Sequence, residues 1–236
     1  MKNWKDHYNT FPALAQRTDY LRQVGKTVNG ETIDDFQVEI IINSIVNYLE
    51  INSNDNVLDL CCGNGMITKE ISAHCRNIVG VDFSHPLIEI ASIAHFAANS
   101  SYINKSILDI RETDFNHKFT KVIMYEALQH FTANQLDKIL NLIRNVSTPN
   151  VKVLLGSIPD KSKLWQYYDT YERKVDFFKR KIFNDEAIGV WWKKRKIVKI
   201  CRANNFNIRF FNQNEGLYTS HYRFDVVLSL IQKKNV

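Results

Sequence analysis

Glycine and proline are scarce in this chain, with 8 and 4 copies among 236 residues. Collagen-like, low-complexity and largely disordered proteins have compositions biased toward such residues, so those classes are excluded. Apolar residues make up 44% of the chain and charged residues 24%, which is the balance of a globular protein. A chain of this length buries roughly 70% of its surface on folding, so its core needs neither a disulfide nor a metal.

Paired cysteines and long apolar runs are also missing. The four cysteines stand at positions 61, 62, 75 and 201, without C-x-x-C spacing, so we expect free thiols and no metal site. The first residues hold no apolar stretch of signal-peptide length. The most apolar stretch, residues 38–49, is interrupted by polar residues and is too short to span a bilayer. We therefore expect a cytoplasmic protein without membrane insertion; its oligomeric state is left open.

Positive charge is concentrated in one segment. The whole chain has a formal net charge of +6, but residues 161–199 hold twelve bases and five acids and therefore carry +7. Such a local field attracts an anionic small molecule or a nucleic acid. A solvated helix face explains the same pattern equally well.

Strand and helix patterns alternate along the chain. Strands are expected at residues 56–60, 77–81, 101–104, 121–124, 151–155, 208–211 and 224–231. Helices are expected at residues 37–50, 67–75, 84–98, 133–146 and 190–204. This alternation predicts a mainly parallel sheet with helices on both faces. In such sheets ligands bind beyond the carboxyl ends of the strands.

A glycine-bearing turn follows the first predicted strand. The segment runs Asp59-Leu-Cys-Cys-Gly-Asn-Gly65, and Asp82 ends the next strand 19 residues after Gly63. Glycines in a strand-to-helix turn let the backbone approach a ligand closely, and an acid at this distance binds both hydroxyls of a ribose. A nicotinamide dinucleotide and S-adenosylmethionine both present such a ribose.

Two residues favour S-adenosylmethionine over the dinucleotide. Asp59, expected at the mouth of the site, would repel a pyrophosphate but suits a cationic sulfonium. Thr68 stands where the dinucleotide motif has its third glycine. The sequence therefore favours a methyl donor, and a dehydrogenase is the weaker alternative.

These residues resemble the class I S-adenosylmethionine-dependent methyltransferase family. Residues 59–65 look like its first motif, residues 81–84 like its second, and residues 107–110 like the acid and apolar residue that hold adenine. Residues 123–131 are similar to the segment after the fourth strand. The likeness covers residues 36–158 and the closing hairpin. It implies a Rossmann-like sheet of seven strands with an antiparallel last strand, an N-terminal lid and an insertion after the fifth strand.

One position departs from the family pattern. The family commonly has glycine where this chain has Cys61. A positive φ would strain a cysteine there, so we expect an ordinary backbone at Cys61. Gly63 and Gly65 are then the two glycines that the turn requires.

The resemblance implies roles for the donor-site residues. Asp82 is expected on the ribose, and Asp109 on the adenine amino group, with Ile110 packed on the ring. Phe83 either covers the other ring face or belongs to the core, and Asp59 is expected beside the methionine part. The cofactor-binding residues are therefore predicted to be Asp59, Cys61, Gly63, Gly65, Asp82, Phe83, Asp109, Ile110 and Tyr125.

The acceptor side is less constrained. Methyl transfer is an in-line displacement, so orientation of the two reactants is the main task. His130 is the candidate general base for an acceptor that loses a proton, although it also suits a structural role beside the next helix. The acceptor-binding candidates are Tyr20, Glu126, Gln129, Trp165, Tyr168 and Tyr222.

We expect one methyltransferase domain with four parts. Residues 1–36 form a lid or a plain surface arm, and residues 37–158 the donor-binding core. Residues 159–190 form an acceptor-side insertion, whose aromatic residues suit either a pocket or a helix packing face. Residues 191–236 form the closing helix and hairpin.

Taken together, these features predict methyl transfer to an O or N atom of a polar, anionic small molecule. A phosphorylated or nucleotide-linked metabolite or sugar suits the positive field, and tailoring of a surface glycan is one such role. The alternatives are an RNA methyltransferase, suggested by the bases at 193–199, and a donor-binding subunit without catalysis. RNA is disfavoured, since residues 125–128 lack the Asn/Asp-Pro-Pro-aromatic pattern of enzymes that methylate base amino groups.

Overall fold

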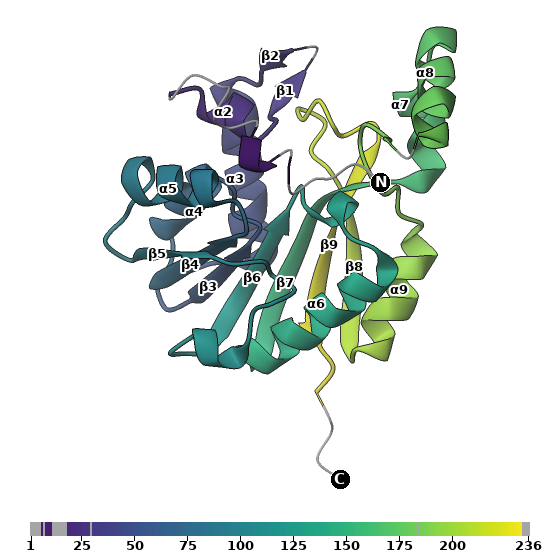
Figure 1. Cartoon of the computed structure of the whole chain (residues 1–236). Coiled ribbons are helices and arrows are strands. Elements are labelled where there is room, and N and C mark those ends of the chain that lie inside the picture. The colour runs from purple at the N-terminus through teal and green to yellow at the C-terminus, as the bar shows by residue number, and fades with distance from the viewer. Residues whose placement is uncertain (1–5, 7, 11–17, 29, 184, 233–236) are drawn as a thin grey trace.

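The computed structural model describes residues 6, 8–10, 18–28, 30–183 and 185–232. Its centre is a seven-stranded sheet in the order β5-β4-β3-β6-β7-β9-β8 (Figure 1). The strands are β3 (Asn56–Leu60), β4 (Asn77–Asp82), β5 (Ser100–Asn104), β6 (Phe119–Tyr125), β7 (Ser147–Pro159), β8 (Phe206–Asn212) and β9 (Arg223–Leu230). β9 runs antiparallel to both of its neighbours, β7 and β8, and the other pairs of neighbouring strands among these seven are parallel. The predicted sheet, including its antiparallel last strand, is confirmed.

Helices cover both faces of the sheet, as predicted. On one face α6 (Ala133–Val146) and α9 (Lys194–Ala203) pack against the large apolar core, which includes Leu58 and Leu60 of β3. On the other face α3 (Asp35–Leu49) and α4 (Met66–Ser72) pack against Val57 of the same strand. Successive residues of a strand point to opposite faces, which explains why β3 contributes to both cores.

The helix boundaries follow local capping. Thr132 and Gln135 form a reciprocal capping box at the start of α6. The Ser84 side chain caps α5 (His85–Ala94), which has a proline in its first turn. We predicted this helix to run to about residue 98, but it ends at Ala94. His95 leaves the helix because its ring bonds the Asn64 carbonyl oxygen and its own carbonyl accepts from Tyr102.

The closing helix begins later than predicted. Residue 190 was its expected start, yet α9 begins at Lys194. The Trp192 amide donates to the Pro159 carbonyl at 2.8 Å, and Trp192 forms a bridge with Asp160. Residues 190–192 are therefore held beside the end of β7 and cannot join the helix.

Two segments stand beyond the carboxyl ends of the strands (Figure 1). The N-terminal arm contains the short helix α2 (Tyr20–Gln23) and a hairpin of β1 (Thr27–Val28) and β2 (Glu31–Thr32). The insertion after β7 contains α7 (Leu164–Tyr167) and α8 (Tyr171–Ile182). Within the described ranges, no helix combines the length and apolar character needed to cross a bilayer.

Candidate functional site

Residues with left-handed backbones lie at or near the carboxyl ends of three adjacent strands, β3, β6 and β7. Cys61 follows β3 with φ 63°, Glu126 follows β6 with φ 52°, and Ser157 lies in β7 with φ 57°. Our expectation of an ordinary backbone at Cys61 was therefore wrong. Its amide and that of Cys62 both donate to the Val81 carbonyl, at 2.8 and 3.1 Å, which forces the tight turn. Strained positions of this kind cluster at functional sites.

The glycine turn and Asp82 form one hydrogen-bonded unit. Gly63 and Gly65 adopt φ values of 58° and 78°, as their predicted role requires. The Gly63 amide donates to Asp82 Oδ2 at 3.0 Å, and the Ser84 amide donates to Oδ1 at 2.9 Å. Burial raises the pKa of Asp82, and these amide donors partly offset that rise. Each carboxylate oxygen keeps a further lone pair for a ligand hydroxyl.

Asp59 lies beneath the turn rather than at the mouth of the site. Its side chain is 3% exposed and accepts a hydrogen bond of 2.7 Å from the Thr68 hydroxyl. Burial raises its pKa to about 7, against the opposing effect of that hydroxyl. Thr68, which replaces the third glycine of the dinucleotide motif, thus binds the acid under the turn.

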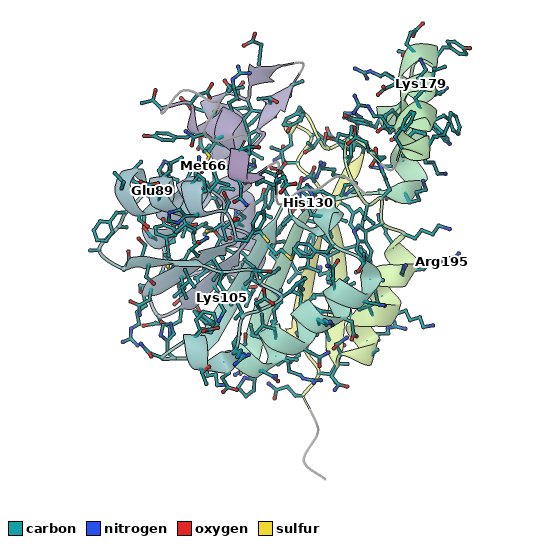
Figure 2. The ribbon with its side chains drawn as sticks, in the orientation of Figure 1. Met66, Glu89, Lys105, His130, Lys179 and Arg195 are labelled. Atoms are coloured by element: carbon teal, nitrogen blue, oxygen red, sulfur yellow. The ribbon has the colours of Figure 1, made fainter. Side chains whose placement is uncertain are left out.

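A cavity lies at the carboxyl ends of β3, β4 and β6. The predicted site residues that line it are Cys61, Gly63, Asp82, Phe83, Tyr125, Glu126 and His130. Residues that line it but were not among the predicted site residues are Tyr8, Val24, Lys26, Cys62, Asn64, Met66, Ile67, Leu87, Ala127 and Phe131. Figure 2 places His130 centrally, above the ends of the strands. The glycine turn and the segment after β6 therefore face the same cavity.

The arm contributes a cation, Lys26, to the lining of this cavity. Lys26 Nζ donates to Glu126 Oε2 at 2.5 Å and stands 5.3 Å from the centre of the Tyr125 ring. Burial alone would raise the pKa of Glu126, but Lys26 and Arg223 outweigh it and hold that pKa below its ordinary value. Lys26 stands in a polar stretch of the sequence, and no local pattern pointed to its partner.

Tyr8 of the arm lies between Phe83 and His130. Its ring meets Phe83 edge-on at 6.5 Å and His130 edge-on at 5.6 Å. Its hydroxyl lies 3.5 Å from His130 Nε2, and the Ser84 hydroxyl donates to its carbonyl at 2.6 Å. Burial raises the pKa of Tyr8, and Glu126 and Asp82 raise it further. The hydroxyl therefore stays neutral in this position.

A buried polar network supports the segment after β6. The Asp225 carboxylate accepts from the Ser157 amide at 2.6 Å, and Arg223 Nη1 donates to the Ser157 carbonyl at 2.6 Å. The Ser157 hydroxyl reaches Glu126 Oε1 at 3.3 Å. Burial raises the pKa of Asp225 to about 6. β9 thereby positions Ser157, and Ser157 positions Glu126.

Several predicted donor residues do not line the cavity. Asp109 is exposed to solvent, and Ile110 is buried in the core of the α6 face. A Cβ on Gly65 would contact Tyr102 and Ala91, so this glycine serves packing beneath the turn. The assignment of Asp109 to adenine stays a prediction.

The predicted acceptor residues are also dispersed. Tyr20 packs edge-on against His95 at 4.5 Å, and Gln129 Nε2 donates to the Glu126 carbonyl. Trp165 and Tyr168 pack on Phe177 of α8, at 5.5 and 4.9 Å. Tyr222 packs on Tyr167 and Trp191 in the same aromatic group. Of the six candidates, the structure brings only Glu126 to the cavity.

A profile described as a methyltransferase domain matches residues 57–150, the segment that carries the glycine turn, Asp82 and the residues after β6. This match supports the predicted resemblance to the class I S-adenosylmethionine-dependent methyltransferase family. The predicted reaction class and methyl donor, S-adenosylmethionine, agree with this match.

Curated relatives of this methyltransferase share part of its sequence. The ubiquinone biosynthesis O-methyltransferase of Rickettsia canadensis is 29% identical over 133 residues, which are 56% of this chain and 55% of that protein. An rRNA uracil-C(5) methyltransferase of Pasteurella multocida is 34% identical over 123 residues, 50% of this chain and 26% of that protein. The chain thus spans about half the length, or less, of these curated relatives.

Solved structures share the fold over most of the chain. The magnesium protoporphyrin IX methyltransferase of Synechocystis, with bound S-adenosylmethionine, superposes with a TM-score of 0.60 at 15% identity. That match covers 95% of this chain and 94% of the other. The cyclopropane synthase MmaA2 of Mycobacterium tuberculosis has a TM-score of 0.65 at 14% identity, over 88% and 77% of the two chains. Likeness at this level of identity concerns the fold alone.

Proposed function

We propose that this methyltransferase binds S-adenosylmethionine in the cavity between the glycine turn and His130, and transfers its methyl group to a polar small molecule. One observation carries the proposal: Asp82 on the donor side and Glu126 with His130 on the other side line the same cavity. A reaction between two bound molecules needs such a shared space.

The residues present suit this donor. The two hydroxyls of a ribose are matched by the free lone pairs of the Asp82 carboxylate. A Cβ on Gly63 would lie 2.9 Å from Val24 Cγ1. Because glycine has no Cβ, the backbone of the turn can come close to Val24 or to a ligand. Asp82, Glu126 and Lys26 are the charged residues among those that line the cavity. Their summed charge of −1 favours a cationic donor over a pyrophosphate.

The chain's own residues orient the reactants and manage one proton. The donor supplies a methyl carbon that is already activated by a positively charged sulfur. When the acceptor atom bonds to that carbon, the carbon–sulfur bond breaks and the sulfur becomes neutral. Asp82 and the glycine turn hold the donor, and His130 takes the proton that a hydroxyl or amine acceptor loses. Glu126 accepts a hydrogen bond from the acceptor once Lys26 has moved away.

The arm acts as a lid on this site. Tyr8, Val24 and Lys26 line the cavity from the arm, so a donor enters only when the arm moves. The arm, core, insertion and closing segment then divide the work along the predicted boundaries at residues 36, 158 and 190. Lid movements of this kind admit substrate and exclude water.

The acceptor we propose is an anionic small molecule methylated on oxygen or nitrogen. Two observations support it: the charge of +7 on residues 161–199, and the two buried cations Lys26 and Arg223 near Glu126. Phosphorylated and nucleotide-linked metabolites or sugars have this charge. The name of the Rickettsia relative, an O-methyltransferase, supports oxygen as the acceptor atom.

Calorimetric titration with S-adenosylhomocysteine tests the donor site, with the nicotinamide dinucleotides as controls. Micromolar binding of the former alone supports the proposal; no binding by a protein shown to be folded overturns it. Transfer of labelled methyl to phosphorylated or nucleotide-linked acceptors, and not to their neutral analogues, supports the acceptor class. Donor binding without transfer to any metabolite in an extract favours a non-catalytic donor-binding subunit.

A second candidate is methyl transfer to RNA. A groove beside the start of α9 favours it, because bases and tryptophan line it together. The lining residues include Lys161, Lys193, Arg195, Lys196, Lys199, Trp191 and Trp192. Figure 2 shows Arg195 pointing away from the body of the protein. RNA affinity that falls steeply with added salt, together with labelling of the RNA, would establish this candidate.

A further inference from the structure

The insertion after β7 carries an apolar stripe that faces solvent. Tyr171, Val175, Phe178 and Ile182 recur at intervals of four, three and four residues along α8, which places them on one face of a helix. Tyr171, Phe178 and Ile182 are 77%, 54% and 76% exposed, and Phe183 just beyond the helix is 78% exposed. A soluble surface rarely leaves such residues contiguous without a partner.

The stripe is separate from the packing of α8 onto the protein. Phe177, 4% exposed, is the residue by which α8 packs on the body, against Tyr168 of the segment after α7. Trp165 bridges the two faces, since its ring lies 5.5 Å from Phe177 and 6.0 Å from Phe178. Residues of the stripe therefore contribute little to the fold, and they do not line the donor cavity.

Bases surround the stripe. α8 holds five bases and two acids. Arg180 pairs with Asp176 and Asp185, and Arg173 pairs with Asp169. The other three bases of the helix, Lys174, Lys179 and Lys181, are in none of these pairs. Lys181 and Lys161 lie over the Phe177 ring, at 5.9 and 5.8 Å, and so border the packed face of the helix beside the stripe. Figure 2 places Lys179 near the outer end of this helix. An apolar face with a basic border is the pattern of helices that lie in the interface of a membrane.

We propose that α8 docks this methyltransferase on an anionic phospholipid surface, with its apolar stripe among the acyl chains and its bases at the headgroups. Anionic headgroups attract bases close to a bilayer, while Phe178, Ile182 and Phe183 need an apolar partner. A second copy of the chain would set the net positive α8 against itself. RNA bases stack on aromatic side chains such as Tyr171 and Phe178, but RNA offers no apolar partner to Val175 and Ile182.

α8 stands on the same side of the molecule as the cavity. α7 and α8 follow β7 beyond the same carboxyl-end edge that bears the arm and the cavity (Figure 1). A bilayer that contacts α8 therefore lies on the side of the molecule from which the cavity is reached. The docking itself requires no methyl transfer and stands independently of the proposed reaction.

Flotation of the full-length protein with lipid vesicles tests the proposal. The vesicles contain phosphatidylcholine alone or phosphatidylcholine mixed with phosphatidylglycerol. The test variant is Phe178→Ser with Ile182→Ser. The matched control is Ile93→Ser with Phe96→Ser, since those two side chains are also exposed, 76% and 62%, but lie at the end of α5. Circular dichroism and the melting temperature establish that both variants are folded.

We expect the wild type to float with the anionic vesicles and not with the neutral ones. The α8 variant should lose about tenfold or more in vesicle affinity because it loses two apolar anchors, while the control keeps it. Lys179→Gln with Lys181→Gln should weaken binding and flatten its salt dependence. Absence of wild-type binding, equal binding by the two serine variants, or equal binding to neutral vesicles overturns the proposal. Concentration-dependent dimers that only the α8 variant loses would also overturn it, in favour of a second copy.

Discussion

Lys26 and Glu126, 100 positions apart in the chain, form an ion pair of 2.5 Å between Nζ and Oε2. Their side chains are 5% and 20% exposed, so little water screens the pair. The contact joins the arm to the left-handed turn after β6. It therefore links closure of the cavity to the ionised state of Glu126.

The ion pair predicts a cost for neutralising the lysine. Lys26→Gln leaves the Glu126 carboxylate partly buried with one cation fewer, and we expect a loss of about 1–3 kcal/mol in the free energy of unfolding. Urea denaturation measures this. Lys118→Gln is the matched control, because Lys118 forms an exposed pair with Glu112 that contributes about 0–1 kcal/mol. Equal effects of the two variants would contradict a structural role for the Lys26 contact.

The glycine turn predicts a clash with the arm. A Cβ in Gly63→Ala would lie 2.9 Å from Val24 Cγ1, at a φ of 58°. We expect faster proteolysis within residues 18–28 and weaker binding of S-adenosylhomocysteine. The double variant Gly63→Ala, Val24→Ala should restore protection of the arm without restoring binding. If it restores both, the clash alone explains the loss and close approach of the ligand to the turn does not.

Asp82 predicts different outcomes for two substitutions. Asp82 is 5% exposed, and its carboxylate accepts hydrogen bonds from two backbone amides. Asp82→Ala should therefore cost about 1–3 kcal/mol, since it leaves those amides unpaired. Asp82→Asn keeps one acceptor oxygen, and so one of the two amide hydrogen bonds, and should preserve part of that stability. Calorimetry should find S-adenosylhomocysteine binding weakened at least tenfold in both; wild-type affinity in a folded Asp82→Asn protein would remove Asp82 from the donor site.

His130 predicts separable effects on binding and turnover. If it takes the acceptor's proton, His130→Gln should lower kcat by about 10²–10⁴-fold and leave donor affinity unchanged. His74→Gln, at an exposed position in the turn after α4, is the control. Unchanged turnover in His130→Gln would mean that His130 is not the base and only packs against Tyr8.

Asp59 predicts a pH-dependent difference in stability. Its pKa is raised from about 3.8 to about 7 in the folded state by burial, so the folded protein holds a proton that the unfolded chain releases between these values. The Asp59 proton therefore contributes to the stability of the folded state in full below pH ~4. This contribution to the free energy of unfolding is lost as the pH rises to ~7. Asp59→Asn has no proton to lose in this range. The free energy of unfolding of the variant, relative to that of the wild type, should therefore increase with pH by at most ~4 kcal/mol. Thermal unfolding at pH 5 and pH 8 measures the change; a constant difference would mean that Asp59 is ionised in the folded state throughout.

Most of the fold follows from local patterns. The strand at Asn56–Leu60 and the helix at Ala133–Val146 were predicted with the bounds that the structure has, because alternation, apolar spacing and caps are properties of short segments. The end of α5 and the start of α9 were wrong, because His95 and Trp192 are held by Asn64 and Pro159 from other parts of the chain.

The meeting of Gly63 and Asp82 at one cavity was predictable for the same reason. Gly63 and Asp82 lie in turns that directly follow strands, and the topology of a parallel sheet brings such turns to one edge. The left-handed backbone of Cys61 was missed because two amides compete for one carbonyl of the neighbouring strand. The burial of Asp59 was missed because it depends on what packs over the turn.

The sequence by itself determined the alternation of strands and helices, the edge of the sheet at which the cavity lies and the resemblance to the methyltransferase family. Each of these follows from short-range pattern and spacing. Only the tertiary structure decided that Lys26 meets Glu126, that Tyr8 lies between Phe83 and His130, and that the stripe on α8 is left without a partner. These relationships join residues far apart in the chain, and packing and burial, rather than local propensity, set their energies.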